Sequence, residues 1–338
     1  MDSKKLSTSV LLNIKELINT KKKILLVSHY SPDGDAIGSS LGLYYFIKDV
    51  LSKDCVVYNR DGIPNYLSFL GADEIIHDSI ETLPKDFDLA IILDLNDFER
   101  TGSEMSNYLD LTIKDNDLPI IVIDHHENNK IENSEATYID TDASSTGVLV
   151  YRLIKQFPEI TNESVKSKIS TCLLTTIITD TSSFKNSNVN PETFEICKEL
   201  LSMGGDLETL NKSIFNNGEI KRLQLRNKIY STLDFNEELK TAICHSTDSF
   251  YDETGTTKED SEGIANSLLN YSDVEIGIFI REIGTDKWKI SLRSNGFKDL
   301  SDFAGRFGGG GHKNASGFRF DGKIQILIEG IIKELKNG

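Results

Sequence analysis

Four short apolar runs in this chain each end abruptly in acidic or histidine residues. The runs are 24–27, 89–93, 120–123 and 173–179, and they lead respectively into His29, Asp33 and Asp35, into Asp94, into Asp124-His125-His126, and into Asp180. Buried strands of a parallel sheet are typically short and continuously apolar, and ligands bind just beyond the carboxyl ends of such strands. The pattern therefore favours an α/β fold and predicts a metal centre at the edge of its sheet.

Strand-like and helical segments alternate from residue 24 to about residue 150. The expected strands include 55–58, 89–93 and 120–123, and the expected helices include 36–48, 147–154 and 165–178. Such alternation predicts a parallel sheet with helices on both faces. Small residues such as Gly38 and Gly42 are expected to let the helix over 36–48 pack close to the sheet. We expect Asp180 to lie just past a helix and not at the end of a strand.

The length of 338 residues is sufficient for two domains, since single cores stop growing at about 250–300 residues. Met203-Gly204-Gly205 is the clearest break in the middle of the sequence. We expect a first, metal-binding domain over 1–203, a helical linker over 204–230 and a smaller α/β domain over 231–338. The second domain is expected to close over the first.

The charge of the chain limits its partners. The net charge is −16, which argues against a protein that coats long or duplex nucleic acid, because such proteins carry a basic surface. Residues 281–320 nevertheless contain eight Lys/Arg against four Asp/Glu, a local balance of +4. This composition suits a small anionic ligand bound in a local basic pocket.

The sequence contains neither a membrane span nor a cysteine framework. No apolar stretch reaches the ~20 residues of a transmembrane helix, and the amphipathic N-terminal segment lacks the features of a signal peptide. The four cysteines are widely spaced without a CxxC pair, which fits a reducing, cytoplasmic location.

The acidic and histidine residues at the strand ends have a charge balance that suits two divalent cations. Asp33, Asp35, Asp94 and Asp180 supply four negative charges, and Asp94 is placed to bridge two metals. Ligands that mix carboxylate with imidazole favour manganese over magnesium. Taken singly, each aspartate also has an ordinary interpretation as a helix cap or turn residue. The two adjacent histidines are expected to point to opposite sides, so that one binds metal and the other contacts a carboxylate or a phosphate.

A run of four glycines, Gly308 to Gly311, followed by His312 predicts a different kind of site. Glycines allow the backbone to approach a ligand closely and to direct amides at an anion. His312, Lys313 and Arg293 would add charged contacts to phosphate. A flexible glycine-rich turn is the structural alternative for this segment.

Together these motifs resemble the DHH phosphoesterase superfamily in its DHH–DHHA1 subfamily. The triplet that names the family matches Asp124-His125-His126, the first motif matches the segment from His29 to Asp35, and further motifs match Asp94 and Asp180-Thr181. The DHHA1 signature matches Arg293-Ser294 and the segment from Gly308 to Gly317. The resemblance spans nearly the whole chain. Its length and motif order are similar to those of the bifunctional oligoribonuclease and 3′-phosphoadenosine-5′-phosphate phosphatase group, the nanoRNases.

The resemblance implies a parallel-sheet DHH domain, a smaller α/β DHHA1 domain and an active site in the cleft between them. It implies manganese-dependent hydrolysis of short oligoribonucleotides and of 3′,5′-bisphosphonucleosides such as pAp. The implied residues are His29, Asp33 and Asp94 for one metal, Asp35, Asp94, His125 and Asp180 for the other, Asp94 and His126 as catalytic residues, and Arg293, Ser294, Gly309, Gly310, Gly311 and His312 for substrate phosphate. A homodimer is compatible with the resemblance, although no sequence feature requires one.

Other functions fit the same motifs. The chain could act mainly on linear dinucleotides such as pGpG, or on polyphosphate, and the residues do not rank these substrates. A non-catalytic sensor of nucleotide and metal is a further alternative, against which the intact set of metal ligands argues.

Overall fold

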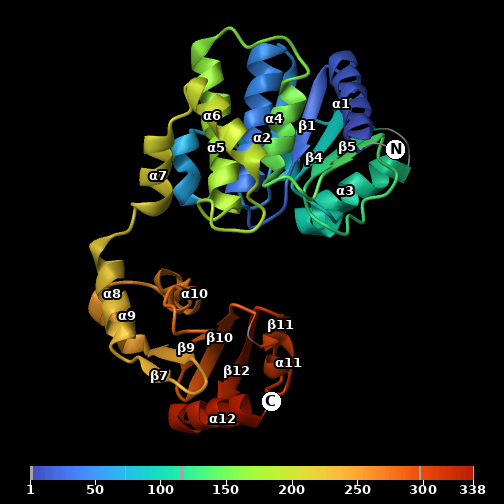
Figure 1. Ribbon diagram of the computed structural model, residues 1–338. Helices are drawn as coiled ribbons and strands as arrows, with labels where there is room; N and C mark the ends of the chain where they lie inside the picture. Colours follow the sequence, from blue (N-terminus) through green and yellow to red (C-terminus); the bar gives the residue numbers. More distant parts are fainter. Residues whose placement is uncertain (1–2, 73, 115–117, 297, 338) are drawn as a thin grey trace. The chain divides into compact units, whose positions relative to one another are not determined.

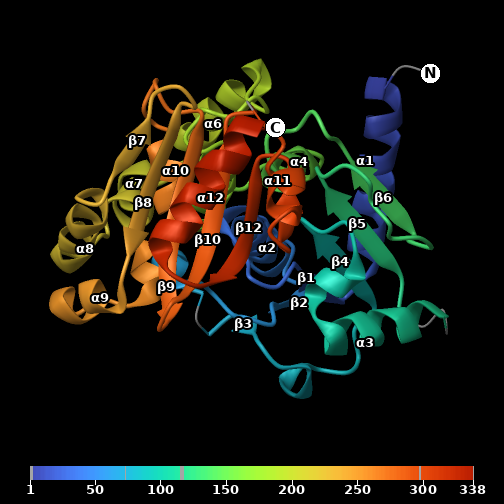
Figure 2. The same ribbon diagram turned by 90° about the horizontal axis from the view of Figure 1, so that it is seen from below.

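The computed structural model describes residues 3–72, 74–114, 118–296 and 298–337. The chain divides into two compact units, Met1–Asn217 and Gly218–Gly338. The first unit contains a six-stranded, entirely parallel sheet in the order β3-β2-β1-β4-β5-β6, of which β1, β4 and β5 are labelled in Figure 1 and all six strands in Figure 2. Its strands are β1 (Lys23–Val27), β2 (Asp54–Tyr58), β3 (Ile76–His77), β4 (Leu89–Leu93), β5 (Ile120–Asp124) and β6 (Ala136–Ile139). The expected parallel α/β fold is confirmed.

The order of the strands creates a crevice site at the centre of this sheet. From β1 the chain proceeds outward through β2 and β3, and then returns to place β4 on the other side of β1. Where strand order reverses in this way, the connections leave the two strands in opposite directions, and open α/β sheets bind their ligands there. The carboxyl ends of β1 and β4 therefore mark the expected position of a site.

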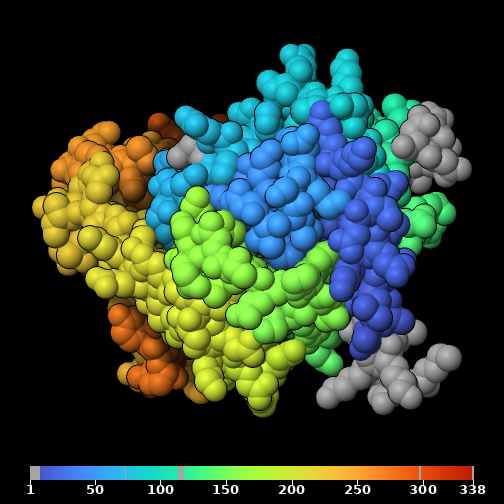
Figure 3. All heavy atoms as spheres, turned by 90° about the horizontal axis from the view of Figure 1, so that it is seen from above, coloured from blue at the N-terminus to red at the C-terminus, as the bar shows by residue number. Residues whose placement is uncertain are grey.

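Helices cover both faces of the first sheet, as the alternating pattern predicts. One face packs against the helices α1 (Ser3–Thr20), α2 (Gly34–Tyr45), α4 (Thr146–Ile154) and α5 (Glu163–Asp180). The other face packs against α3 (Ser103–Lys114) and neighbouring loops. In the space-filling view, α1 (dark blue) lies at the surface beside the green segment that contains α4 (Figure 3).

The small residues of α2 contact another helix and not the sheet, which corrects the expectation from the sequence. A Cβ added at Gly38 would lie 2.6 Å from the carbonyl oxygen of Cys172, and one at Gly42 would lie 2.9 Å from the side chain of Leu173; both partners are in α5. The glycine face thus turns away from the strands because α5 packs against it. This close packing brings the last residue of α5, Asp180, to the start of α2.

Two further helices complete the first unit, and the sequence between the units is helical. The helices are α6 (Pro191–Ser202) and α7 (Leu207–Phe215) in the first unit, followed by α8 (Ile220–Tyr230) in the second. The segment 204–230 therefore contains two separate helices, one in each unit.

The second unit contains a mixed six-stranded sheet in the order β11-β12-β10-β9-β8-β7, in which only β8 and β9 are parallel neighbours. One face packs against α11 (Leu300–Gly305) and α12 (Ile324–Asn337), drawn in red in Figure 2. The other face is covered around β8 and β9 by α8, α9 (Asp248–Thr254) and α10 (Ile264–Leu268). The strands are β7 (Asp234–Asn236), β8 (Thr241–Ser246), β9 (Ile276–Gly284), β10 (Lys287–Ser294), β11 (Gly310–His312) and β12 (Ala315–Asp321).

None of the helices that the structure describes combines the length and apolar character of a membrane span. The four cysteines, Cys55, Cys172, Cys197 and Cys244, are all buried and free, and burial raises the pKa of each thiol. They are core residues and offer no nucleophile.

Candidate active site

The ends of three neighbouring strands deliver functional side chains to one edge of the first sheet. His29 lies two residues beyond β1, Asp94 directly follows β4, and His125 and His126 directly follow β5. Asp94 has a φ of 57°, in the left-handed region that few residues other than glycine adopt. Such a backbone conformation is retained where the surrounding structure enforces it, and it is frequent at functional sites.

The loop after β1 supplies two aspartates with different environments. The Oδ1 atom of Asp33 caps α2 by accepting hydrogen bonds from the amides of Asp35 and Ala36, at 3.0 and 3.1 Å. Asp35 is only 1% exposed, and its two oxygens accept hydrogen bonds from the amides of Thr146 and Gly147 at the start of α4, at 2.7 and 3.1 Å. The capping interpretation is therefore confirmed for Asp33, whereas Asp35 is buried and bound to α4, whose N-cap is Ser145. These hydrogen bonds fix both carboxylates at the site.

Asp180 reaches the same place from a helix. It is the last residue of α5, one position earlier than the expected place just past the helix. The side chain of Asn188 donates a hydrogen bond to its Oδ2 at 3.1 Å. The close packing of α5 on α2 explains why a residue from a helix end joins residues from strand ends.

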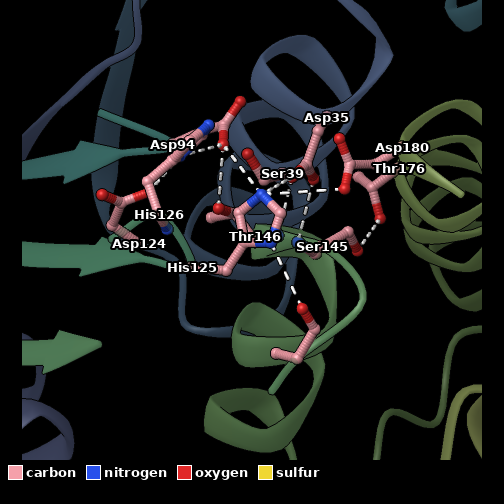
Figure 4. A network of polar contacts seen from close by, with 12 residues as sticks. Asp35, Ser39, Asp94, Asp124, His125, His126, Ser145, Thr146, Thr176 and Asp180 are labelled. Atoms are coloured by element: carbon pink, nitrogen blue, oxygen red, sulfur yellow. Dashed lines mark hydrogen bonds and ion pairs between the residues drawn. The ribbon is translucent and has the colours of Figure 1, made fainter. Parts of the chain in front are cut away.

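The predicted metal ligands of the first unit lie together, and their ligand atoms form three overlapping groups (Figure 4 shows the central part). In each group all ligand atoms lie within 4.8 Å of one another. The groups are His29, Asp33 and Asp94; Asp35, His125 and Asp180; and Asp94, His125 and His126. Asp94 is shared by two groups and is 2% exposed, so the central carboxylate is also one of the most buried.

The two predicted histidine ligands present the same nitrogen to the carboxylates. The Nδ1 atoms of His29 and His125 lie 2.8 and 3.2 Å from the backbone carbonyl oxygens of Tyr30 and Ala143. A carbonyl oxygen can only accept, so Nδ1 carries the proton in each ring and Nε2 faces the acids. The Nε2 atom of His29 lies 3.4 Å from Asp94, and that of His125 lies 3.6 to 3.8 Å from Asp35, Asp94 and Asp180.

This arrangement fits a bound cation. In a neutral histidine with Nδ1 protonated, Nε2 has a lone pair, which would repel the carboxylate oxygens that it faces here. A cation between them, or a proton on the ring, removes that repulsion. The donor set, which combines buried carboxylates with oriented imidazoles, therefore meets the chemical requirements of a divalent-metal site.

The pKa values of the acids show that burying several carboxylates next to one another disfavours their charged forms. Burial, and then the charges of Asp94 and Asp180, hold the pKa of Asp35 well above its usual value. Burial, together with the charges of Asp94 and Asp33, raises the pKa of Asp180 to about 6 despite the opposing effect of His125. Burial also acts to raise the pKa of Asp94, but its contacts with His29 and the other two histidines outweigh burial and lower it. Of these three carboxylates, Asp94 is thus the one whose pKa is lowered.

The expectation that His125 and His126 point to opposite sides is wrong. The Nε2 atom of His125 and the Nδ1 atom of His126 lie 3.8 and 3.6 Å from the same oxygen of Asp94. The reason is that β5 ends at Asp124, so the alternation of an extended strand no longer applies. Asp124 fixes the second ring, because its Oδ1 lies 2.8 Å from Nδ1 of His126. His126 remains partly exposed, with 38% of its side chain accessible.

Sequence reasoning missed two residues that hold the predicted ligands. The hydroxyl of Thr146 donates to Oδ1 of Asp94 at 3.1 Å, while its amide donates to Asp35. Asn188 supports Asp180 as described above. The run of Ser144, Ser145 and Thr146 before an apolar stretch is a helix-start signal, and Ser145 does cap α4. That signal locates the helix but does not reveal that Thr146 faces Asp94.

The predicted phosphate-binding residues lie in the second unit and form a separate group. Arg293 on β10, Ala315 on β12 and His312 on β11 occupy one row across the sheet. Arg293 is partly exposed and His312 is exposed. Ser294 is buried, and its hydroxyl accepts a hydrogen bond from the amide of Gly296 at 3.1 Å. The structure thus gives Ser294 a turn-stabilising contact, and its role toward substrate stays a prediction.

The glycine run forms one strand of a hairpin, and two of its members have structural reasons to be glycine. A Cβ at Gly309 would lie 2.2 Å from the carbonyl oxygen of Gly317, and one at Gly311 would lie 2.6 Å from that of Ala315. Gly311 also has a φ of +144°. A Cβ at Gly310 would meet no atom within 4 Å. Close pairing of β11 with β12 therefore accounts for Gly309 and Gly311, whereas Gly310 leaves open space above the sheet.

The chain matches known proteins along most of its length. The model of the DHH family N-terminal domain matches residues 23–177, and that of the DHHA1 domain matches residues 240–337. A bifunctional oligoribonuclease and PAP phosphatase NrnA of Thermus thermophilus is 30% identical over 92% of this chain and 90% of its own length. A protein of the same name from Mycoplasma genitalium is 26% identical over 96% and 98% of the two chains.

A solved structure extends this similarity to three dimensions. An exopolyphosphatase-related protein of Bacteroides fragilis aligns with a TM-score of 0.82 and 31% identity, and it covers 98% of this chain and 96% of its own. The two domains and their order along the chain are thus accounted for by one family. The chain is a member of the DHH family, with a DHH domain followed by a DHHA1 domain, and is a metal-dependent phosphoesterase.

Proposed function

We propose that this enzyme hydrolyses short oligoribonucleotides to mononucleotides and also removes phosphate from 3′,5′-bisphosphonucleosides such as pAp. The observation that carries the proposal is the cluster in which four aspartates, of which Asp35 and Asp94 are buried, meet oriented histidines at the switch point of a parallel sheet. Support for the substrates comes from relatives named as bifunctional oligoribonucleases and PAP phosphatases, which align with this chain over nearly their full length.

We further propose that the site holds two divalent cations and that these are Mn²⁺. His29, Asp33 and Asp94 would hold one, and Asp35, Asp94, His125 and Asp180 would hold the other. Four carboxylates balance the charge of two such ions, and mixed oxygen and nitrogen donors suit manganese. When bound, a metal pair supplies Lewis-acid stabilisation of the attacking and leaving oxygens in an in-line displacement at phosphorus.

The remaining contacts define what the protein contributes to the reaction. The hydroxyl of Thr146 fixes one oxygen of Asp94, while the amides that begin α4 fix Asp35. Such outer contacts orient ligands and keep the site geometry constant. His126, which Asp124 holds and which is partly exposed, is proposed to contact the substrate phosphate at the reacting centre.

The second unit is proposed to bind a phosphate group of the nucleotide through Arg293, His312 and the amides of the glycine run. Guanidinium and imidazole groups make charge-assisted hydrogen bonds to phosphate. The chain as a whole is strongly acidic, with a net charge of −16, and repels long polyanions. We therefore propose short substrates in preference to long RNA or duplex DNA, and a reducing cytoplasm as the location on account of the four free cysteines.

The variant Asp94→Ala tests the proposal. Loss of the shared carboxylate should reduce release of mononucleotides from di- and trinucleotides by about a hundredfold to a thousandfold, since about 2.7–4 kcal/mol is a typical loss when one group that stabilises the transition state is removed. Asp110→Ala, at an exposed position on α3, is the matched control and should keep wild-type activity. Full activity of Asp94→Ala, with folding verified by circular dichroism, would overturn the proposal.

A substrate panel distinguishes this proposal from a second candidate. The structural relative from Bacteroides fragilis is named an exopolyphosphatase-related protein, so polyphosphate is a specific alternative. RNA of two to ten nucleotides, pAp, pGpG and polyphosphate should be compared with Mn²⁺ and with Mg²⁺. We expect the highest kcat/KM for short RNA and pAp with Mn²⁺. A preference for polyphosphate over every nucleotide would favour the alternative.

A further inference from the structure

The face of the second sheet that α8, α9 and α10 cover in part carries basic residues in two rows across its strands, and a row of small residues separates them. The first row contains Arg293, Ala315 and His312, as described above. The next row contains Ser291, Gly317 and Gly310, which pair in register across β10, β12 and β11. The third row, hereafter the basic row, contains Arg281 on β9, Lys289 on β10 and Arg319 on β12, again in register.

All three rows lie on the same face because side chains alternate along a strand. The residues between them on β10 and β12, namely Ile290, Leu292 and Phe318, are buried in the core on the other face. Lys289 and Arg319 are exposed and Arg281 is partly exposed. The small residues of the middle row, hereafter the floor, therefore lie between Arg293 on one side and the long side chains of the basic row on the other.

A pocket opens on this face. Its volume is about 340 Å³, and the residues of the three rows that line it are Arg281, Lys289, Ser291 and Arg293. Phe279 and the segment 261–266, which includes the acidic residue Glu262, line the rest of the pocket. Ligand pockets for small molecules typically fall in the range of about 300–1,000 Å³. The pocket is thus large enough for part of a nucleotide, and it continues from Arg293 to the basic row.

The basic row is electrostatically unfavourable without a ligand. Like charges placed directly opposite one another on neighbouring strands destabilise a sheet, and this row places three side by side. Arg281 donates a hydrogen bond to the backbone carbonyl of Lys258 at 2.9 Å, and its charge is one of the effects that lower the pKa of Glu259. Among the residues that the structure describes, however, no carboxylate forms an ion pair with Arg281, Lys289 or Arg319. A solvated surface normally mixes both signs of charge, so this row has the properties of an anion site.

We propose that the basic row binds a second phosphate group of the substrate, one that is not hydrolysed. This inference rests on the proposed function in that it assumes a nucleotide whose other phosphate is bound at Arg293 and His312. Lys289 and Arg293 are four residues apart on one strand, which corresponds to about 13 Å between their backbones. Their long side chains can lean toward each other, so two phosphates of one short nucleotide chain can be bound at once, with a nucleoside over the floor.

The chemistry of the row favours phosphate over other anions. Two guanidinium groups flank one ammonium group, and guanidinium binds phosphate through two parallel hydrogen bonds. A row of this kind favours substrates that carry more phosphate groups and does not distinguish one base from another. The enzyme is therefore expected to prefer substrates that carry a phosphate beyond the one it cleaves.

The double variant Lys289→Gln/Arg319→Gln of the full-length protein tests the inference. Both side chains are exposed, so the fold should be unaffected. The control, Lys323→Gln/Lys333→Gln, removes the same charge from the exposed N-terminal flank and surface of α12. The substrates are ApA, whose only phosphate is the one cleaved, and pApA and pApApA, which carry additional phosphates.

For the row variant we expect kcat/KM to fall by about tenfold to a hundredfold on pApA or pApApA, as for the loss of charged hydrogen bonds. On ApA the change should stay within about twofold, as for an ordinary surface substitution. The control should change little on all three. An equal loss on ApA, or no loss on any substrate, would overturn the inference while leaving the proposed function intact.

A binding measurement keeps the inference testable even if RNA is not the substrate. With EDTA present to block hydrolysis, fluorescence anisotropy of labelled pApApA should show tighter binding to the wild type than to the row variant, and ApA should show no such difference. Equal affinities of the two proteins for pApApA would overturn the inference. Absence of hydrolysis by the wild type on all three substrates would overturn the proposed function instead.

Discussion

The two units of this enzyme collect opposite charges by opposite means. In the first unit, four aspartates and three histidines converge around the buried carboxylates of Asp35 and Asp94, and hydrogen bonds from Thr146, Asn188 and the start of α4 hold the acids. In the second unit, Arg281, Lys289, Arg293 and Arg319 stand exposed or partly exposed on one face of a sheet. The hydrogen bonds that Arg281 and Arg293 donate within the described residues go to backbone carbonyl oxygens, those of Lys258 and Leu292.

The difference indicates what each unit is built to bind. Preorganisation lowers the reorganisation needed during a reaction, and the acid–histidine cluster has the support that a catalytic metal site requires. Exposed cations are held loosely and can adapt to a flexible anion. We therefore assign chemistry to the first unit and recognition to the second, and each of the following variants should affect one of these functions and not the other.

Thr146→Val tests whether the support of the acid–histidine cluster matters. The variant keeps the shape of the side chain but removes the hydroxyl that donates to Asp94. Loss of an outer contact of this kind typically costs about 10- to 100-fold in metal affinity or activity, so kcat and Mn²⁺ affinity should fall together. Thr146→Ser, which keeps the donor, should restore most of both. An unchanged Thr146→Val enzyme would show that the hydroxyl is incidental.

Arg293→Gln tests the recognition half of the comparison. We expect KM for a dinucleotide to rise by about tenfold, because a charged hydrogen bond to phosphate is lost, while Mn²⁺ affinity stays at the wild-type value. Steady-state kinetics combined with calorimetric titration of Mn²⁺ separates the two effects. A fall in Mn²⁺ affinity as well would contradict the assignment of chemistry to the first unit and recognition to the second.

Gly38→Ala tests how the two helices that carry Asp35 and Asp180 are held together. The added methyl would lie 2.6 Å from the carbonyl oxygen of Cys172, so α5 must shift, and overpacking of this kind costs about 1–3 kcal/mol of unfolding free energy. Gly330→Ala on α12, where a Cβ meets no atom within 4 Å, should instead be neutral or stabilising. Urea denaturation of both variants measures the contrast, and equal stability of the two would contradict it.

The strands and the site were predictable because they depend on local patterns. The apolar runs 24–27, 89–93 and 120–123 correspond to β1, β4 and β5, and a parallel sheet brings the ends of its strands to one edge. His29, Asp94 and His125 were therefore placed correctly by sequence alone.

The errors arose where tertiary packing decides the outcome. The sequence shows that Gly38 and Gly42 allow close packing, but it does not identify the packing partner, which is α5 and not the sheet. The directions of His125 and His126 depend on where β5 ends. Thr146 carries a helix-start signal, but only the fold places its hydroxyl against Asp94. Likewise, the basic row appears in the sequence merely as a local excess of Lys and Arg, since strand register is what aligns its members.

The location of Mn²⁺ in crystals grown with the metal tests the central claim most directly. Anomalous scattering collected at the manganese edge should show two peaks about 3.5–4 Å apart. One peak should lie among His29, Asp33 and Asp94, and the other among Asp35, Asp94, His125 and Asp180. A single peak, or two peaks that do not share Asp94, would contradict the account of a two-metal phosphoesterase site.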